Sequence, residues 1–190
     1  MTGPPPSPHS QTLQTVVQLA VSSAAGELGW LAVPGPGDDL VVAAATAVQG
    51  VPTLPFGHRL DGAHSYGGFV VETSQPVALQ LRSGDDRAVS ELAALGASSG
   101  QLLAVPCVHD DDCLGVLEVV AGEDRGRFDL DDLELITLLG SVAGAAIDER
   151  LGGSAPPSAE QLGAALAQLA ASDPGRFATV SRLVAAVLGP

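Results

Sequence analysis

Lysine and asparagine are both absent from the chain, and aromatic residues make up only 3% of its 190 residues. Because aromatics are scarce, a core has to be filled by Val, Leu and Ala, within an apolar fraction of 46%. The two missing residue types share A-rich codons, which suggests a GC-rich bacterial genome. The length suffices for one domain of ordinary size and an appendage.

Positive charge is also scarce, since eight Arg against 22 acidic residues give a formal net charge of −14. Nucleic acid and anionic membrane surfaces both attract clustered positive charge, so neither is an expected partner. Between residues 110 and 149 there are 12 acidic residues, opposed only by Arg125 and Arg127. This acidic face either keeps the protein soluble or docks a basic protein partner.

Long apolar runs are missing as well. The longest of note, Val41–Ala45, is far shorter than the ~20 residues of a membrane span. The N-terminus has no basic segment followed by an apolar one, so a secretory signal is not expected and the predicted location is cytoplasmic. Two cysteines are too few for a disulfide framework.

The hydrophobic pattern predicts one α+β domain over residues 10–151, after a disordered Pro-rich segment at 1–9. Ser7-Pro8 fits the start of a first helix, whose apolar stripe begins at Leu13. The expected elements after it are strands at 28–33 and 40–44, an irregular stretch at 45–65, a helix at 65–73, a strand at 76–81, a helix at 86–97, and strands at 102–108 and 114–121 around a short acidic turn.

A long helix is predicted after Asp129, which is placed to cap it. The helix is apolar on two sides, one with Leu135, Leu138, Val142 and Ala145, the other with Ile136, Leu139, Ala143 and Ile147. Such a helix must be covered twice, by its own sheet and by a second element. The second cover could be the first helix or another subunit.

The last 40 residues predict an appendage. Residues 152–157 read as a linker and 158–190 as a C-terminal helical hairpin, which starts at a capping box of Ser158 and Gln161. Its apolar stripes pack either on the preceding domain or on another chain.

Three segments carry a resemblance to a known family: LLAVPCV, LGVLEVV and FDLDDLELITLLGSVAGAAIDE. Together with the order of elements they resemble the GAF domain family over about residues 11–151. The resemblance implies a PAS-related fold, with a central antiparallel sheet, terminal helices on one face and a ligand pocket roofed by loops on the other. The Asn-Lys-Phe-Asp-Glu pattern of cyclic-nucleotide-binding members is absent, and no Cys lies where bilin-binding members attach their pigment.

Candidate ligand-binding residues gather in and near the irregular stretch, where the resemblance places the pocket roof. His58, Arg59, His64 and Tyr66 could contact a polar ligand, or could belong to an ordinary polar loop. Trp30 and Phe69 are either ligand platforms or core aromatics. The two histidines could also hold haem in this fold, although a single loop histidine is rarely a ligand.

Cys107 and Cys113 flank the acidic turn and are weak redox candidates. They could face each other across the hairpin if its loop holds an odd number of residues. In a reducing cytoplasm free thiols are expected, with Cys107 as a small core residue. The turn also contains metal-ligand types, but consecutive residues splay apart, so no metal site is predicted.

These observations predict a non-enzymatic sensory or regulatory protein. It would bind an unidentified small molecule and signal through protein contact, as a homodimer or through its C-terminal helices or acidic face. No cofactor can be named. Two alternatives stay open: a dimerisation or interaction module without a ligand, and a thiol-based redox enzyme or sensor of the same fold, similar to free methionine sulfoxide reductase.

Overall fold

The structure is a computed structural model that describes residues 8–151. The chain divides into two units, Met1–Leu151 and Gly152–Pro190, and all described residues belong to the first. The predicted linker and C-terminal helical hairpin lie outside the described residues, as does the Pro-rich segment up to residue 7. No helix among the described residues is long and apolar enough to span a bilayer.

The first unit alternates helices with antiparallel strands. In chain order the elements are α1 (Pro8–Ser23), β1 (Leu28–Pro34), β2 (Asp39–Ala47), β3 (Arg59–Asp61), α2 (Tyr66–Thr73), β4 (Val77–Arg82), the 3-10 turn η1 (Asp86–Ala88), α3 (Val89–Leu95), β5 (Ser99–His109), β6 (Asp112–Ala121), the 3-10 turn η2 (Glu123–Arg125) and α4 (Leu130–Leu151). Every predicted strand and helix in this range is present.

The strands form one sheet in the order β3-β2-β1-β6-β5-β4, and all neighbours are antiparallel. The first and last long strands of the chain, β1 and β6, therefore pair at its centre. The predicted α+β class with a central antiparallel sheet is confirmed. The stretch predicted to be irregular differs in two places, because β2 extends to Ala47 and three residues near its end form the edge strand β3.

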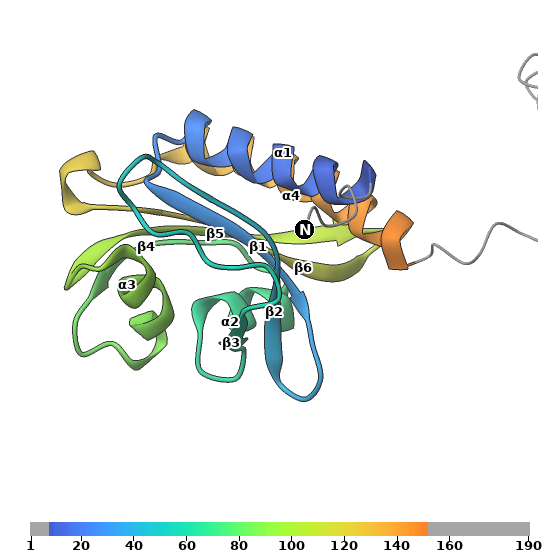
Figure 1. Cartoon of the computed structure of the whole chain (residues 1–190), viewed down its shortest axis with the longest axis horizontal. Coiled ribbons are helices and arrows are strands. Elements are labelled where there is room, and N and C mark those ends of the chain that lie inside the picture. The colour runs from blue at the N-terminus through green and yellow to red at the C-terminus, as the bar shows by residue number, and fades with distance from the viewer. Residues whose placement is uncertain (1–7, 152–190) are drawn as a thin grey trace, which may run out of the picture. The chain divides into compact units, whose positions relative to one another are not determined.

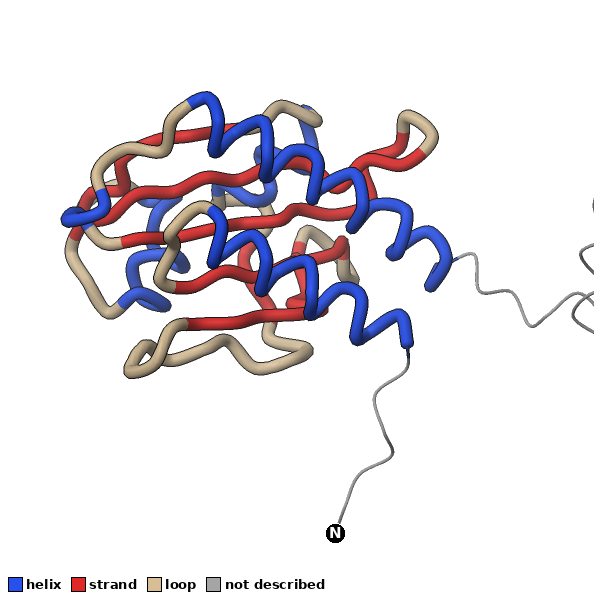
Figure 2. The backbone as a smooth tube through the Cα atoms, turned by 90° about the horizontal axis from the view of Figure 1, so that it is seen from above, coloured by secondary structure: helices blue, strands red, loops and turns tan. Residues whose placement is uncertain are grey.

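Helices α1 and α4 cover one face of the sheet and run side by side across it (Figures 1 and 2), as predicted for the terminal helices. We call this the α1/α4 face. Its core is apolar and includes Leu13 and Val17 of α1, Ile136 and Ile147 of α4, and Leu103, Val105, Leu117 and Val119 of the sheet. The predicted stripe of α1 and one of the two predicted sides of α4, that of Ile136 and Ile147, thus point into the core, whereas Leu135, Leu138 and Val142 of the other side are exposed.

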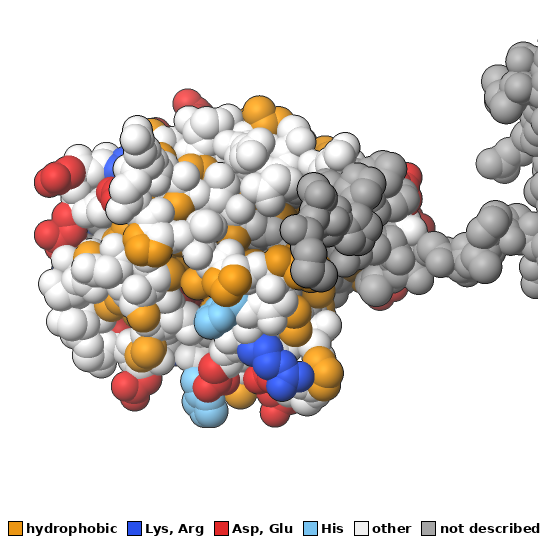
Figure 3. All heavy atoms as spheres, viewed as in Figure 1, with side chains coloured by type: hydrophobic (Ala, Val, Ile, Leu, Met, Phe, Trp, Pro, Cys, Tyr) orange, Lys and Arg blue, Asp and Glu red, His pale blue; other side chains and the backbone are white. Residues whose placement is uncertain are grey.

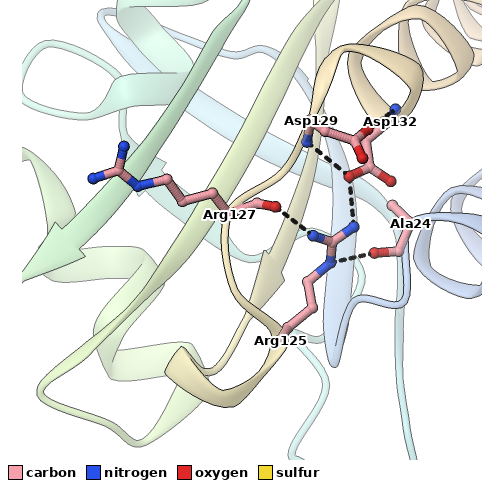
Figure 4. A network of polar contacts seen from close by, with 5 residues as sticks. All are labelled: Ala24, Arg125, Arg127, Asp129 and Asp132. Atoms are coloured by element: carbon pink, nitrogen blue, oxygen red, sulfur yellow. Dashed lines mark hydrogen bonds and ion pairs between the residues drawn. The ribbon is translucent and has the colours of Figure 1, made fainter.

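A polar network ties the ends of these two helices together (Figure 4). Arg125 donates through Nε to the carbonyl oxygen of Ala24 at 2.7 Å, just beyond the end of α1, and through an amino group to Asp132 of α4 at 2.6 Å. Its guanidinium also stacks on Phe128, 4.2 Å from the ring centroid. Asp129 caps α4 as predicted, and Asp132 bonds back to the amide of Asp129.

The opposite face is covered by α2, η1 and α3 (Figure 1), and we call it the α2/α3 face. Its apolar core includes Trp30, Val42, Leu81, Leu92, Leu102, Val116 and Val120. Alternate residues of β5 and β6 thus enter opposite cores, which explains why both strands read as continuous apolar runs. At the tip of their hairpin, Asp110 and Asp111 have φ of 47° and 71°, the signature of a two-residue type I′ turn.

Candidate functional site

One charged side chain interrupts the apolar core of the α2/α3 face. Side chains alternate along β6, so Leu117 and Val119 enter the α1/α4 core while Glu118 points to the opposite face with Val116 and Val120. Only 1% of Glu118 is exposed. Carboxylates are almost never fully buried unless they are paired, so this position calls for an explanation.

A second buried carboxyl group reaches the same place from above the sheet. Glu91, in the first turn of α3, is also 1% exposed and lies next to Glu118. Burial raises the pKa of Glu118 well above the usual glutamate value, and the neighbouring charge of Glu91 raises it further. Burial also raises the pKa of Glu91, against the opposing effects of a backbone hydrogen bond and the Glu118 carboxyl. The two groups therefore hold protons at pH values where exposed glutamates have lost them.

Trp30 completes the group from the neighbouring strand. The β1–β6 register places Trp30 directly opposite Glu118, so their side chains are cross-strand neighbours on the buried face. The indole nitrogen is near enough to favour the charged form of Glu118, yet it has no partner in hydrogen-bond geometry. Among the described residues, three buried side-chain polar atoms lack a partner: Trp30 Nε1, Glu91 Oε2 and Glu118 Oε2.

Helix α2 lies tightly against this group because two glycines occupy its first turn. Any side chain at position 67 would collide with the Glu118 carboxyl, and one at position 68 would collide with the carbonyl oxygen of Gly62. Ser65 caps the helix by accepting a hydrogen bond from the Gly68 amide at 3.1 Å. The sequence predicted this helix in spite of its glycines; close approach to Glu118 and Gly62 is the reason for them.

Two side-chain contacts join α2 to the η1 turn before α3. The Tyr66 hydroxyl donates to Asp85 at 2.6 Å, and burial together with this contact raises the pKa of Tyr66 to about 12. The Arg87 guanidinium lies over Phe69, 5.5 Å from the ring centroid. These contacts close the two short helices over the carboxyl pair.

Of the predicted ligand-binding residues, the structure thus places Trp30, Tyr66 and Phe69 around one buried polar group. His58, Arg59 and His64 are exposed instead (Figure 3 shows His, Arg and acidic side chains together on the surface). Arg59 pairs with Asp39 of β2 at 3.2 Å, and His64 contacts Asp61 at 3.2 Å. Both ion pairs lie at the surface, where such contacts contribute little energy.

The cysteines lie elsewhere. Cys107 is buried in the core of the α1/α4 face, on the other side of the sheet from Trp30, and burial raises the pKa of its thiol. Cys113 is half-buried and donates to the carbonyl oxygen of Gly115. Both thiols are free. The register pairs Cys113 with Val108, so the two cysteines do not face each other across the hairpin.

Two surface hollows lie beside the sheet, one next to α2 and one next to α1, and neither is lined by Glu91 or Glu118. An open hollow of about 440 Å³ runs beside α2, and its wall includes Asp38, Asp39 and Glu72. A more apolar hollow of about 230 Å³ lies between α1 and β2 and is lined in part by Phe56. Within residues 8–151, no three His, Cys, Asp or Glu side chains converge to hold a metal ion.

Sequence reasoning missed Glu91 and Glu118, although one of them left a signal. Glu118 is the only charged residue in LGVLEVV, and it occupies a position that the strand period assigns to a buried face. Glu91 gave no such signal, because a Glu in the first turn of a short helix is ordinary. Only the packing of α3 on the sheet places it beside Glu118.

Comparisons with known proteins agree on one fold. The sequence profile described as "GAF domain" matches residues 7–148. Among solved structures, the second GAF domain of DevS from Mycobacterium smegmatis is similar at 19% identity, covering 76% of this chain and 96% of that chain, with a TM-score of 0.60. A GAF domain/HD domain protein from Geobacter sulfurreducens is similar at 15% identity, covering 76% and 94%, with a TM-score of 0.62. No curated protein matches the sequence.

Proposed function

The chain belongs to the GAF domain family, and from that premise we propose that it is a non-enzymatic sensory protein which binds a small molecule and signals as a homodimer. Domains of this family are sensory and regulatory modules that bind small molecules. The proposal adds the output, a contact between copies through the terminal helices, and a setting in a bacterial cytoplasm.

The observation that carries the proposal is the outer side of α4. Leu135, Leu138 and Val142 are 41%, 66% and 52% exposed, and they share one side of the helix, beside the residues packed on the sheet. We call these three residues the α4 stripe. An apolar stripe of this kind on a helix that is already half-buried is typical of an interface rather than of a free surface. A second copy of the chain can cover it with the same residues about a two-fold axis.

The opposite face of the sheet supports the sensory half of the proposal. Unpartnered polar atoms are buried there, beneath two short helices. The proposed ligand site and the proposed dimer contact thus lie on opposite faces of one sheet. Strands β5 and β6 contribute side chains to the cores of both faces. A ligand that moves α2 or α3 would act on strands that α4 also contacts.

The thiol-based alternative has less support. Cys107 lies in the α1/α4 core, away from the buried polar group, and the raised pKa of its thiol opposes the thiolate that redox chemistry needs. The ligand-free alternative has one observation in its favour, because α2 packs so closely on Glu118 that position 67 has no room for a side chain.

Light scattering of the Leu138→Asp variant tests the homodimer. The full chain at micromolar concentration is expected to have twice the 19.0 kDa mass of one copy, and the variant is expected to have the mass of one copy. A carboxylate in an apolar interface has no partner and opposes association. Val89→Asp is the matched control, since Val89 is 63% exposed on α3, on the other face of the sheet.

The control should remain a dimer with the circular dichroism of the original chain. A wild-type chain that is monomeric would contradict the proposal, and so would a Leu138→Asp variant that stays dimeric.

A further inference from the structure

The buried polar group of the α2/α3 face has more hydrogen-bonding capacity than the protein satisfies. Trp30 Nε1, Glu91 Oε2 and Glu118 Oε2 come from β1, α3 and β6, and the three side chains are neighbours. More than nine in ten buried polar groups in folded proteins have a partner, so three such orphans in one place are unusual, and the partner that the protein itself offers the two glutamates is a proton shared between their carboxyl groups. Each orphan lowers the stability of the folded state, because desolvation is not compensated.

The local charge shows which partner is missing. Asp85, Glu91 and Glu118 surround the site, while Arg87 is the nearby cation and stacks on Phe69. Two adjacent buried carboxyl groups cannot both ionise without a counter-charge. The unpartnered carboxyl oxygens accept hydrogen bonds from a charged donor, and the neighbouring indole also attracts cations.

We propose that Trp30, Glu91 and Glu118 bind a small organic molecule through a protonated nitrogen, such as an ammonium or amidinium group. This inference rests on the small-molecule sensing proposed above and names the chemical class of the ligand. In this arrangement the N–H groups of the ligand donate to the carboxyl oxygens of Glu91 and Glu118 that lack a partner, and the indole of Trp30 contacts the cation. The positive charge replaces the proton that the pair otherwise keeps.

Entry requires that α2 and α3 separate, which is opposed by the packing of Val70 and Leu92 on the sheet and by two side-chain contacts. The Tyr66–Asp85 hydrogen bond and the Arg87–Phe69 stacking join the two short helices over the site. Gly67 leaves the Glu118 carboxyl directly beneath α2, so a ligand that contacts Glu118 displaces this helix. A ligand that binds Glu118 therefore also moves α2, and a sensor requires such a conformational change on ligand binding.

Proton competition gives the site a characteristic pH dependence. The facing titratable groups are Tyr66 from α2, Asp85 from η1, Glu91 from α3 and Glu118 from β6. Because the carboxyl pair retains protons above the usual range, a cationic ligand must displace them. Its affinity should therefore rise as the pH is raised from mildly acidic to mildly alkaline values.

The chain offers a built-in reporter, because Trp30 and Tyr66 are its only Trp and only Tyr. We suggest acetamidine as the probe and acetamide, a neutral molecule of the same shape, as its control. Trp30 emission of the full chain should change saturably with acetamidine, in the millimolar range expected for so small a ligand, and should not respond to acetamide. The apparent affinity should increase as the pH is raised.

Substitutions test which residues bind acetamidine. Glu118→Gln and Glu91→Gln should each weaken acetamidine binding by at least about tenfold, since each removes a charged acceptor. Glu72→Gln removes an exposed carboxylate from α2 and should change the affinity by less than about twofold. Circular dichroism of each variant verifies that it is folded.

These outcomes test the cationic ligand and the homodimer separately. Equal responses to acetamidine and acetamide would overturn it, as would an equal loss in Glu72→Gln. Emission that titrates with pH but ignores acetamidine would also overturn it, because the site then binds only protons. In all three cases a dimeric mass that Leu138→Asp abolishes leaves the proposed output intact. A monomeric wild-type chain that still binds acetamidine would overturn the proposed homodimer and would leave the proposed ligand site intact.

Discussion

The two faces of the sheet differ in how completely they are satisfied. The α1/α4 face is apolar throughout its core, and the ends of its two helices are joined by Arg125, whose guanidinium donates to three oxygen acceptors. The α2/α3 face buries two carboxyl groups and an indole nitrogen without full partners. One strand, β6, supplies both faces through adjacent residues, Leu117 and Glu118.

This difference predicts that the two faces of one sheet contribute differently to stability. Apolar burial and a satisfied network stabilise the α1/α4 face, as in an ordinary core. Unpartnered buried polar atoms destabilise the other face, and proteins keep such groups where a site needs them. Substitutions on the two faces should therefore have opposite consequences, even at neighbouring positions.

The largest effect is expected for Leu117→Ala, which opens a cavity in the α1/α4 core. Leu117 is fully buried among side chains of both terminal helices and the sheet. The variant should lose about 3–4 kcal/mol of unfolding free energy, measured by urea denaturation at fixed protein concentration. The exposed Val89→Ala on α3, away from the α4 stripe, should change it by less than about 0.5 kcal/mol, and a similar loss in both variants would contradict the assignment of this core.

A smaller loss is expected for Arg125→Ala, which removes the network between α1 and α4. Asp132 would keep its buried charge without its cation, and the carbonyl oxygen of Ala24 would lose its donor. We expect a loss of about 2–3 kcal/mol in the same assay. Arg127→Ala is the control, since its carbonyl oxygen rather than its side chain contacts Arg125. A loss of equal size in the control would show that Arg125 acts only as surface charge.

The sequence predicted the α1/α4 face almost completely. Its helices show a clear apolar period, and Asp129 stands where a cap is needed. The sequence failed on β3, because three residues at a sheet edge show no period and only pairing with Asp39, Leu40 and Val41 defines the strand. Short elements of this kind are set by tertiary contacts rather than by local preference.

The sequence indicated part of the buried polar group, and it missed the rest for a different physical reason. It named Trp30, Tyr66 and Phe69, which lie around that group, and His58, Arg59 and His64, which are exposed; ligand binding by any of them stays a prediction. The pairing of Glu91 with Glu118 depends on a contact between α3 and β6 across 27 residues of chain. No local pattern encodes such a contact, so neither carboxyl group was recognised from the sequence.

A smaller difference between the two faces is expected in the pH dependence of the unfolding free energy. The folded chain keeps protons on the carboxyl pair that the unfolded chain releases above the usual glutamate pKa of about 4.3. The free energy of unfolding should therefore fall by about 2 kcal/mol as the pH rises from about 5 to about 8. In the Glu91→Gln, Glu118→Gln double variant this slope should flatten. An unchanged slope would assign the pH dependence to the exposed acidic residues instead.

The most direct test of the account is the unfolding free energy of Glu118→Gln relative to the original chain at two pH values. If the buried carboxyl group is kept for function at the expense of stability, the variant should be more stable by about 1–2 kcal/mol at about pH 8. The gain should shrink at about pH 5, which lies closer to the usual glutamate pKa of about 4.3, so that ionisation of the unfolded chain favours unfolding less. A variant that is less stable at both pH values would contradict the account, because Glu118 would then stabilise the fold as Leu117 does.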